Sequence, residues 1–200
     1  VCRPGDYNTT LGTTLVFKGV APAICRHPQG LVYCHKLPGG LWLPGAASNT
    51  GGQWIGAWFG ESDPAAMDVA AAELLPSRTL AYPLVGRGER FPMLAPEAEA
   101  FFVPEPGDEV ERYAACLQGV ALVERLAYEE LDRVTGAAQP PKHANGPNKQ
   151  AAPGAETRGE VFATGRGSRS DLWMQCRADA TGRLLHRPAA EVSATEAPAA

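Results

Sequence analysis

Long hydrophobic stretches are missing from this chain of 200 residues. No apolar run reaches the roughly 18 residues that a membrane-spanning helix needs, so the sequence indicates no transmembrane helix. The N-terminal residues, Val1 to Pro4, also lack the apolar segment of a secretory signal peptide. We therefore expect a cytoplasmic protein without a membrane partner.

Cysteine and positive charge are both scarce. The five cysteines are odd in number and scattered, which fits reduced thiols in a cytoplasmic protein better than a disulfide framework. The formal net charge is −4, so the chain lacks the basic footprint of a protein that binds nucleic acid. An initiator methionine is absent too, and from this we expect the chain to begin within a longer protein.

Metal-ligating residues in a usual pattern are missing as well. Cys25, His27, Cys34 and His35 form the group that invites a zinc site. Cys34 and His35 are adjacent, so on a strand they would point to opposite faces, and the spacings match no usual zinc pattern. The sequence therefore favours four ordinary side chains here over a metal centre.

Glycine and proline, by contrast, are plentiful, with 22 and 18 residues. They separate short apolar runs from helical segments in a chain whose 44% hydrophobic and 20% charged residues are typical of globular proteins. A length of 200 residues is enough for one sizeable core or two small ones.

The clearest helix is predicted over residues 109–134. Its apolar residues recur at spacings of three and four, as in an amphipathic helix. Gly119 lies in its middle at a cost of about 1 kcal/mol relative to Ala, which indicates close packing or the approach of a ligand. Further helices are predicted over residues 53–59 and after Pro64, where Asp63 is the expected N-cap.

Short strands are predicted where apolar runs lie between turn signals. The predicted strands are residues 15–17, 31–35, 41–43, 79–82 and 161–163. Residues 96–102 are predicted as a short helix or turn. Arg87 and Arg90 lie in a charged turn, where solvated or paired arginines are commoner than anion-binding ones. The polar, proline-containing segment 136–159 is predicted as a mobile surface loop.

The segment 161–182 has the arrangement strand, glycine turn, helix that binds phosphate in many proteins. Glycines let backbone N–H groups approach an anion, and the dipole of the following helix favours it. Ser170 or Asp171 can cap that helix, and Gly182 is placed to end it. A glycine-x-glycine turn alone is weak evidence, and a tight strand-to-helix crossover is an equally good interpretation.

Two earlier segments are also candidates for binding a ligand. The first, residues 11–14, is a threonine-rich glycine turn whose hydroxyls and N–H groups could hold phosphate oxygens, although a simple hairpin fits as well. The second, residues 44–52, is predicted as a glycine-rich loop in which Asn49 offers a donor and an acceptor. The alternative for the second is a loop packed under Trp54 and Trp58.

Taken in chain order, these segments resemble the C-terminal lobe of the FGGY family of carbohydrate kinases. The resemblance rests on LGTTLVFKG, LWLPGAASNTGGQWI, GRGERFPMLAPEAEAFF, CLQGVALVERLAYEEL and VFATGRGSRSDLWMQCRADATGR. It covers nearly the whole chain apart from residues 136–159 and the C-terminal tail. The SNTGG loop looks closer to pentulose kinases of the ribulose or xylulose type than to glycerol kinases.

This resemblance implies an α/β fold of the actin-like ATPase, or ribonuclease H-like, type. Residues 1–200 would form the nucleotide-binding lobe, with ATP and sugar in the cleft between it and an N-terminal sugar-binding lobe. The implied reaction transfers the γ-phosphoryl group of ATP to a sugar hydroxyl, with ATP and Mg²⁺ as cofactors and a pentulose such as ribulose or xylulose as the sugar. The resemblance also suggests a homodimer of the full-length enzyme.

The resemblance also implies which residues contact the nucleotide. The first turn would contact the β- and γ-phosphates, the second would touch ATP, and the last would lie near the adenosine and the α-phosphate. The matching residues are Gly12, Thr13 and Thr14 in the first turn, Gly45 and Asn49 in the second, and Gly165, Arg166 and Ser170 in the last. No acidic Mg²⁺ ligand is assigned.

Two features depart from the family pattern. The family usually has consecutive glycines where this chain has Gly165-Arg166-Gly167, and the arginine could either pair with phosphate or block the adenosine. The general base of the family, an Asp a short way before the first turn, has no match, because Asp6 lies too close to the turn. We therefore expect the catalytic Asp and the sugar-binding lobe to lie upstream. The alternative is a non-catalytic remnant or interaction module that keeps the fold.

Overall fold

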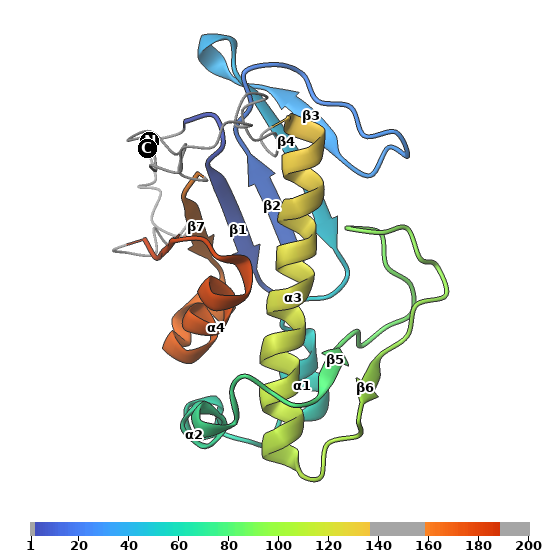
Figure 1. Cartoon of the computed structure of the whole chain (residues 1–200), viewed down its shortest axis with the longest axis vertical. Helices are drawn as coiled ribbons and strands as arrows, with labels where there is room; N and C mark the ends of the chain where they lie inside the picture. The colour runs from blue at the N-terminus through green and yellow to red at the C-terminus, as the bar shows by residue number, and fades with distance from the viewer. Residues whose placement is uncertain (1–2, 137–158, 189–200) are drawn as a thin grey trace, which may run out of the picture.

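The computed structural model describes residues 3–136 and 159–188 of the chain (Figure 1). The predicted surface loop over 136–159 therefore lies almost entirely outside the described residues, as does the C-terminal tail beyond Pro188.

A six-stranded mixed sheet forms the centre of the fold, in the strand order β3-β4-β2-β1-β7-β8. Its strands are β1 (Tyr7–Leu11), β2 (Leu15–Gly19), β3 (Tyr33–Lys36), β4 (Trp42–Ser48), β7 (Val161–Thr164) and β8 (Leu185–His186). The first four strands pair in antiparallel fashion, whereas β7 pairs in parallel with β1 and with β8. In β1 and β2 buried residues alternate with partly exposed ones, as expected for strands that cover a core with one face.

One long helix, α3 (Glu109–Thr135), runs across the sheet and carries much of the core (Figure 1). Asp108 caps its N-terminus by accepting a hydrogen bond from the backbone N–H of Glu111, and Gly136 ends it in the left-handed conformation. Gly119 packs against Ala81 of β5 (Leu80–Tyr82), because a Cβ at Gly119 would collide with the carbonyl oxygen of Ala81. The prediction of close packing at this glycine is confirmed.

Smaller elements surround the N-terminal half of α3 (Figure 1). These elements are α1 (Gln53–Trp58), α2 (Pro64–Ala71), the 3-10 turn η2 (Ala72–Leu74), and the two-stranded sheet of β5 and β6 (Phe101–Val103). The 3-10 turn η1 (Pro38–Gly40) lies elsewhere, on the connection between β3 and β4. Asp63 caps α2 as predicted, accepting from the backbone N–H of Ala65. A further helix, α4 (Asp171–Thr181), lies beside α3 and ends at Gly182, also as predicted.

Two predicted segments have a different structure. Residues 44–48 are not part of a loop but the second half of β4, where small residues fit flat against β2 and its neighbours. Residues 96–102 form no helix: the chain turns and then enters β6, which pairs with β5 across Leu80–Val103 and Tyr82–Phe101. In both cases pairing with a distant strand decided the structure, and local pattern does not reveal such pairing.

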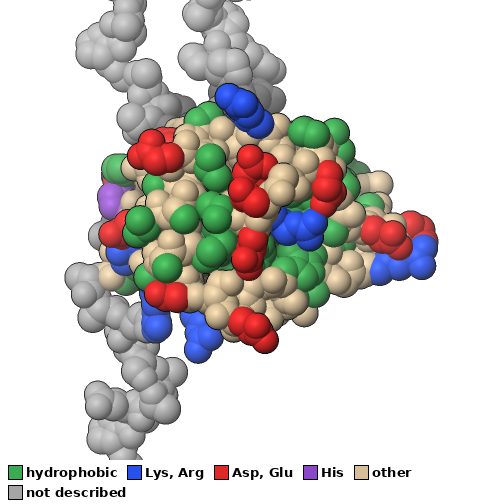
Figure 2. Space-filling model, turned by 90° about the horizontal axis from the view of Figure 1, so that it is seen from below, with side chains coloured by type: hydrophobic (Ala, Val, Ile, Leu, Met, Phe, Trp, Pro, Cys, Tyr) green, Lys and Arg blue, Asp and Glu red, His purple; other side chains and the backbone are tan. Residues whose placement is uncertain are grey.

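Aromatic side chains fill the part of the core between the sheet and the small elements. Trp54 makes edge-on ring contacts with Phe59, Tyr113 and Trp173, at centroid distances of 5.5, 5.2 and 5.7 Å. The surface at the opposite end from β3 shows both acidic and basic side chains among apolar ones (Figure 2). No described helix is long and apolar enough to cross a membrane.

Candidate functional site

The candidate site is centred on the turn that joins β1 to β2, which we name the Gly12 turn (residues 11–14). Leu11 pairs with Leu15 across it, and the N–H of Gly12 donates to the carbonyl of Thr14 at 3.1 Å. Thr13 is exposed at the tip. In the part of the chain that the structure describes, the hydroxyls of Thr13 and Thr14 form no hydrogen bond. Both hydroxyls are therefore free to bind a ligand.

One side of this turn is held by residues 48–53, the Asn49 flank. The N–H of Gly52 donates to the carbonyl of Gly12 at 2.8 Å, and the N–H of Gln53 donates to that of Thr13 at 3.2 Å. The N–H of Leu15 in turn donates to the carbonyl of Thr50 at 3.0 Å. A Cβ at Gly51 would lie 2.5 Å from the Thr13 carbonyl oxygen, so only glycine allows this approach.

The other side is held by residues 165–170, the Gly165 flank. Gly165 has a φ of 86° and a ψ of 176°, a conformation that is open essentially to glycine alone. A Cβ there would lie 2.5 Å from the Leu11 carbonyl oxygen, and one at Gly167 would collide with the Leu11 side chain. The segment is tightened by the buried Ser168, whose hydroxyl donates to the Gly165 carbonyl at 2.7 Å.

The two flanks meet at the buried ring of Trp173. A Cβ at Gly52 would lie 3.7 Å from this ring, and a Cβ at Gly167 would lie 3.0 Å from it. Ser170 caps α4 by accepting from the backbone N–H of Trp173 at 2.9 Å, which settles the choice of cap in favour of Ser170. The indole N–H of Trp173 donates to the Leu117 carbonyl at 3.0 Å, so this ring also fixes the start of α4 to α3.

Two buried ion pairs attach α4 and the chain after it to α3. Arg177 donates to both carboxylate oxygens of Glu124, at 2.6 and 2.9 Å, and both side chains are fully buried. Burial lowers the pKa of Arg177, but the charge and hydrogen bonds of Glu124 outweigh it and hold the pKa above its ordinary value. Arg183 forms the second pair, with Asp132 at 2.5 Å, and Asp132 also accepts from the Tyr7 hydroxyl at 2.8 Å.

Asn49 is turned toward the protein rather than toward the Gly12 turn. Its backbone N–H donates to Glu89 at 2.6 Å, and its side-chain amide N–H donates to the Gly88 carbonyl at 2.8 Å. The side-chain amide oxygen of Asn49 has no partner among the described residues. Asn49 therefore braces the flank and can offer a ligand one acceptor.

Gly45 lies apart from the other implied nucleotide contacts. It is in the middle of β4, opposite Lys18 of β2 and Tyr33 of β3. A Cβ at Gly45 would lie 2.5 Å from the Tyr33 ring. Its lack of a side chain therefore serves the packing of Tyr33, and the structure does not bring it to the turn.

Arg166 has an exposed side chain in the single 3-10 turn η3 (Arg166–Arg169). Among the described residues only glycines adopt a positive φ, so in this segment the positive φ is that of Gly165 and not of Arg166. Arg166 therefore occupies its position without backbone strain, and its guanidinium group extends from the Gly165 flank into solvent.

Glu89 is the residue of this region that the sequence did not reveal. The sequence around Glu89 indicated only a charged turn with Arg87 and Arg90. In the structure Glu89 is 2% exposed and accepts hydrogen bonds from Ser48 and Asn49, about 40 positions away. Arg87 is paired with Glu97 and Glu99 on the surface, as predicted for ordinary surface arginines. No sequence spacing signals that the carboxylate between the two arginines is buried.

The chemistry of the site suits an anionic ligand. Free threonine hydroxyls, a glycine turn and the N-terminus of α4 lie where β1 and its parallel neighbour β7 end, the edge at which open α/β sheets bind ligands. Neither the Gly12 turn nor its two flanks contain an Asp or a Glu. In the part of the chain that the structure covers, no group of His, Cys, Asp and Glu is placed to hold a metal ion.

Comparison with known proteins identifies relatives of the whole arrangement. The model of the FGGY family of carbohydrate kinases, C-terminal domain, matches residues 7–196. Among solved structures, a xyloylose kinase from Brucella ovis has 22% identity and a TM-score of 0.73 over 94% of this chain and 36% of its own. A xylulose kinase from Bifidobacterium adolescentis has 21% identity and a TM-score of 0.73 over 94% of this chain and 34% of its own.

A glycerol kinase from Plasmodium falciparum, solved with ADP, has the same fold at 13% identity. Its TM-score is 0.70 over 92% of this chain and 35% of its own. This chain thus spans about a third of the length of the kinases that it matches. The fold is the α/β actin-like ATPase fold of these sugar kinases, as the sequence predicted.

Proposed function

The chain belongs to the FGGY family of carbohydrate kinases, and from this premise we propose that it is the nucleotide-binding lobe of an ATP-dependent sugar kinase. The observation that carries the proposal is the convergence of two distant glycine segments on the Gly12 turn. Packing of backbone against backbone leaves the tip of the turn rigid and its hydroxyls free. Phosphoryl transfer depends chiefly on positioning and electrostatics, which such a turn supplies.

The terminal phosphates of ATP are assigned to the Gly12 turn. Thr13 and Thr14 present their hydroxyl groups there, and the exposed tip leaves room for phosphate oxygens. The N-terminus of α4 adds the positive end of a helix dipole on the same side. We assign Arg166 to the nucleotide as well, because an exposed guanidinium group on the Gly165 flank can pair with a phosphate from outside.

Mg²⁺ would come to this lobe with the nucleotide. It is usually held by one or two carboxylates together with substrate phosphates, and the Gly12 turn and its flanks offer no carboxylate. We therefore derive no step from a metal bound by the described residues. The general base for the sugar hydroxyl is likewise not assigned here, and we propose that it lies in a part of the enzyme outside this sequence.

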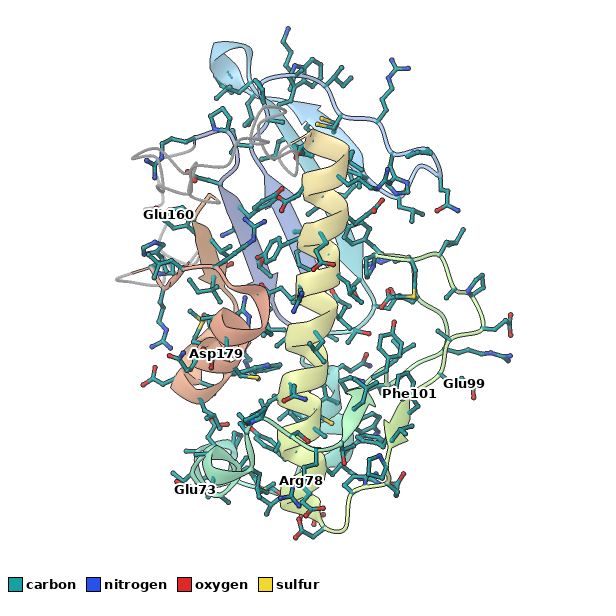
Figure 3. All side chains as sticks on the ribbon, viewed as in Figure 1. Glu73, Arg78, Glu99, Phe101, Glu160 and Asp179 are labelled. Carbon is teal, nitrogen blue, oxygen red and sulfur yellow. The ribbon has the colours of Figure 1, made fainter. Side chains whose placement is uncertain are left out.

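Titration calorimetry of this chain with ATP tests the proposal. We expect saturable binding of ATP and much weaker binding of adenosine, since the phosphates supply most of the contacts. Arg166→Ala should weaken ATP binding about tenfold, the effect of losing one charge-assisted hydrogen bond. The matched control is Arg78→Ala, which removes another exposed arginine, near the N-terminal end of α3 (Figure 3), and should leave ATP binding unchanged.

The absence of binding at millimolar ATP would favour a non-catalytic module that keeps the fold. Tighter binding by Arg166→Ala would show that the arginine excludes the nucleotide.

The sugar is a separate proposal: the SNTGG loop favours a pentulose such as ribulose or xylulose. Release of ADP, measured on an enzyme that contains both lobes with ribulose, xylulose, gluconate and glycerol in turn, decides among these sugars.

A further inference from the structure

Glu89 is a buried carboxylate without a cation. It lies on the connection between β5 and β6, and its own backbone forms a two-way bridge with Ala95, with hydrogen bonds of 2.8 and 2.9 Å. The residue is 2% exposed. Among the described residues no arginine, lysine or histidine forms an ion pair with it. An isolated buried charge is costly, so the neutral groups around Glu89 must stabilise it.

Those neutral groups come from three separate segments of the chain. One carboxylate oxygen accepts from the backbone N–H groups of Asn49, Arg90 and Phe91, at 2.6, 2.8 and 3.4 Å. The other accepts from the hydroxyls of Ser48, Tyr82 and Thr50, at 2.7, 2.7 and 3.0 Å, and from the Thr50 N–H at 3.4 Å. Burial raises the pKa of Glu89, but these hydrogen bonds outweigh it and leave the pKa below its ordinary value.

We propose that Glu89 is a positioning residue for the phosphate site: it fixes Ser48, Asn49 and Thr50 so that the Asn49 flank holds the Gly12 turn in the conformation that binds the nucleotide. This inference rests on the proposed function, because it concerns the same site. Glu89 itself does not touch the ligand.

The connection from Glu89 to the turn is short and continuous. Thr50 bonds to Glu89 through its hydroxyl, and the Thr50 carbonyl accepts the N–H of Leu15 at 3.0 Å, at the far end of the Gly12 turn. The next residues, Gly51 to Gln53, form the direct contacts with Gly12 and Thr13. A shift of the Ser48–Thr50 backbone therefore moves the groups that support the tip of the turn.

The carboxylate also decides which groups are left for the nucleotide. The backbone N–H of Asn49 and the hydroxyls of Ser48 and Thr50 all point at Glu89. They are not available to a phosphate, although the family resemblance implies that Asn49 touches ATP. The contacts with phosphate are thus confined to the Gly12 turn and the Gly165 flank, and the Asn49 flank acts as their support.

The variant Glu89→Gln tests the role of the charge at constant volume. Its amide N–H₂ group can donate but not accept, so at least one set of three donors loses its acceptor. We expect ATP binding to weaken about tenfold, in proportion to a lost charged hydrogen bond at the support of the site. The matched control is Asp6→Asn, which alters another buried carboxylate at the opposite end of β1 from the Gly12 turn, and should leave the ATP affinity of the folded protein within about twofold.

Amide hydrogen exchange followed by NMR gives a second readout that needs no nucleotide. In Glu89→Gln the amides of Leu15, Gly52 and Gln53 should exchange at least about tenfold faster, while in Asp6→Asn these three amides should keep their protection relative to the rest of the sheet. Should Glu89→Gln fail to fold, Thr50→Val removes one donor of the same cluster at nearly constant volume and should shift both readouts in the same direction by less.

The outcomes separate the two proposals. A wild-type chain that does not bind ATP, with faster exchange of the three amides in Glu89→Gln, overturns the proposed function but keeps the support. Unchanged exchange in Glu89→Gln overturns the inference whatever the nucleotide does. An equal loss of ATP affinity in Asp6→Asn overturns it as well, since the effect would then follow stability and not the position of the flank.

Discussion

The two flanks of the Gly12 turn do the same work by different chemistry. Each brings glycine backbone so close to the turn that a Cβ would collide with a carbonyl oxygen, that of Thr13 on one side and that of Leu11 on the other. The Asn49 flank is held from behind by Glu89, a buried carboxylate surrounded by neutral donors. The Gly165 flank is held by α4, which a buried arginine, Arg177, joins to Glu124.

The two flanks show two ways of stabilising the charge of a buried carboxylate. Glu124 is matched by a guanidinium group with two parallel hydrogen bonds, a geometry that fixes one helix against another. Glu89 is matched by backbone N–H groups and hydroxyls, a set that gathers short segments from three places in the chain. The first arrangement joins rigid elements, and the second shapes a loop. Removal of a partner should therefore have a larger effect on stability at Glu124 and a larger effect on the ligand at Glu89.

The largest effect is expected from Arg177→Met. It leaves the fully buried Glu124 without its cation, and such a loss lowers the free energy of unfolding by about 3–5 kcal/mol. Urea denaturation followed by circular dichroism measures the change. The double variant Arg177→Met with Glu124→Gln should recover a large part of the loss. If the single variant were as stable as the double one, the ion pair would not be the main attachment of α4.

Gly165→Ala should have the next largest effect. The alanine would need a backbone conformation that is nearly restricted to glycine, and its Cβ would meet the Leu11 carbonyl. We expect a loss of about 3 kcal/mol in the free energy of unfolding. The control is Gly182→Ala, where φ is also positive but no atom lies within 4 Å of the new Cβ, and the loss should be about 1 kcal/mol. Equal losses would mean that contact with the Gly12 turn contributes nothing.

Gly51→Ala tests the other flank in the same way. Its backbone is open to other residues, but the new Cβ would lie 2.5 Å from backbone atoms of Thr13 and Thr14. We expect a loss of about 2 kcal/mol from overpacking, and weaker ATP binding because the turn must move. Gly56→Ala, in α1 with open space around the new Cβ, should instead raise the free energy of unfolding by about 0.5 kcal/mol. Thermal unfolding of the two variants side by side measures both changes, and a Gly51→Ala protein as stable as Gly56→Ala would contradict the close contact at Gly51.

The smallest effect concerns pH. Because the folded protein lowers the pKa of Glu89, the stabilisation from its ionised form is present above the ordinary value of 4.5 and is lost as the pH falls through the lower folded value. The difference in free energy of unfolding between the wild type and Glu89→Gln should therefore shrink below pH 4.5. Glu130 also has a lowered pKa, chiefly because of its hydrogen bonds with Arg133. It is present in both proteins, so its contribution to the pH dependence cancels in the difference. A difference that stays constant from pH 6 to pH 3 would contradict an ionised Glu89.

The elements that the sequence predicted well are those whose signals are local. The structure has the predicted helix over residues 109–134, the cap at Asp63 and the end of α4 at Gly182, all of which depend on neighbours within a few positions. For the cap of α4 the sequence left Ser170 and Asp171 open, and the structure has Ser170. The second half of β4 was missed, because its small residues carry no strand signal until they pair with β2 and β3. Ordered resemblance of five segments identified the family and the fold.

Sequence by itself thus determined the long helix α3, the cap at Asp63, the end of α4 at Gly182, the glycine turns at residues 11–14 and 165–167, and the family. Only the tertiary structure decided which glycines meet: it brings Gly51, Gly52, Gly165 and Gly167 to one turn, and it leaves Gly45 under the ring of Tyr33. It alone decided that Glu89 is buried and bonded to residues about 40 positions away. The physical reason is range. Caps and helical periodicity act within one or two turns of chain, whereas steric contact and burial depend on segments that only folding brings together.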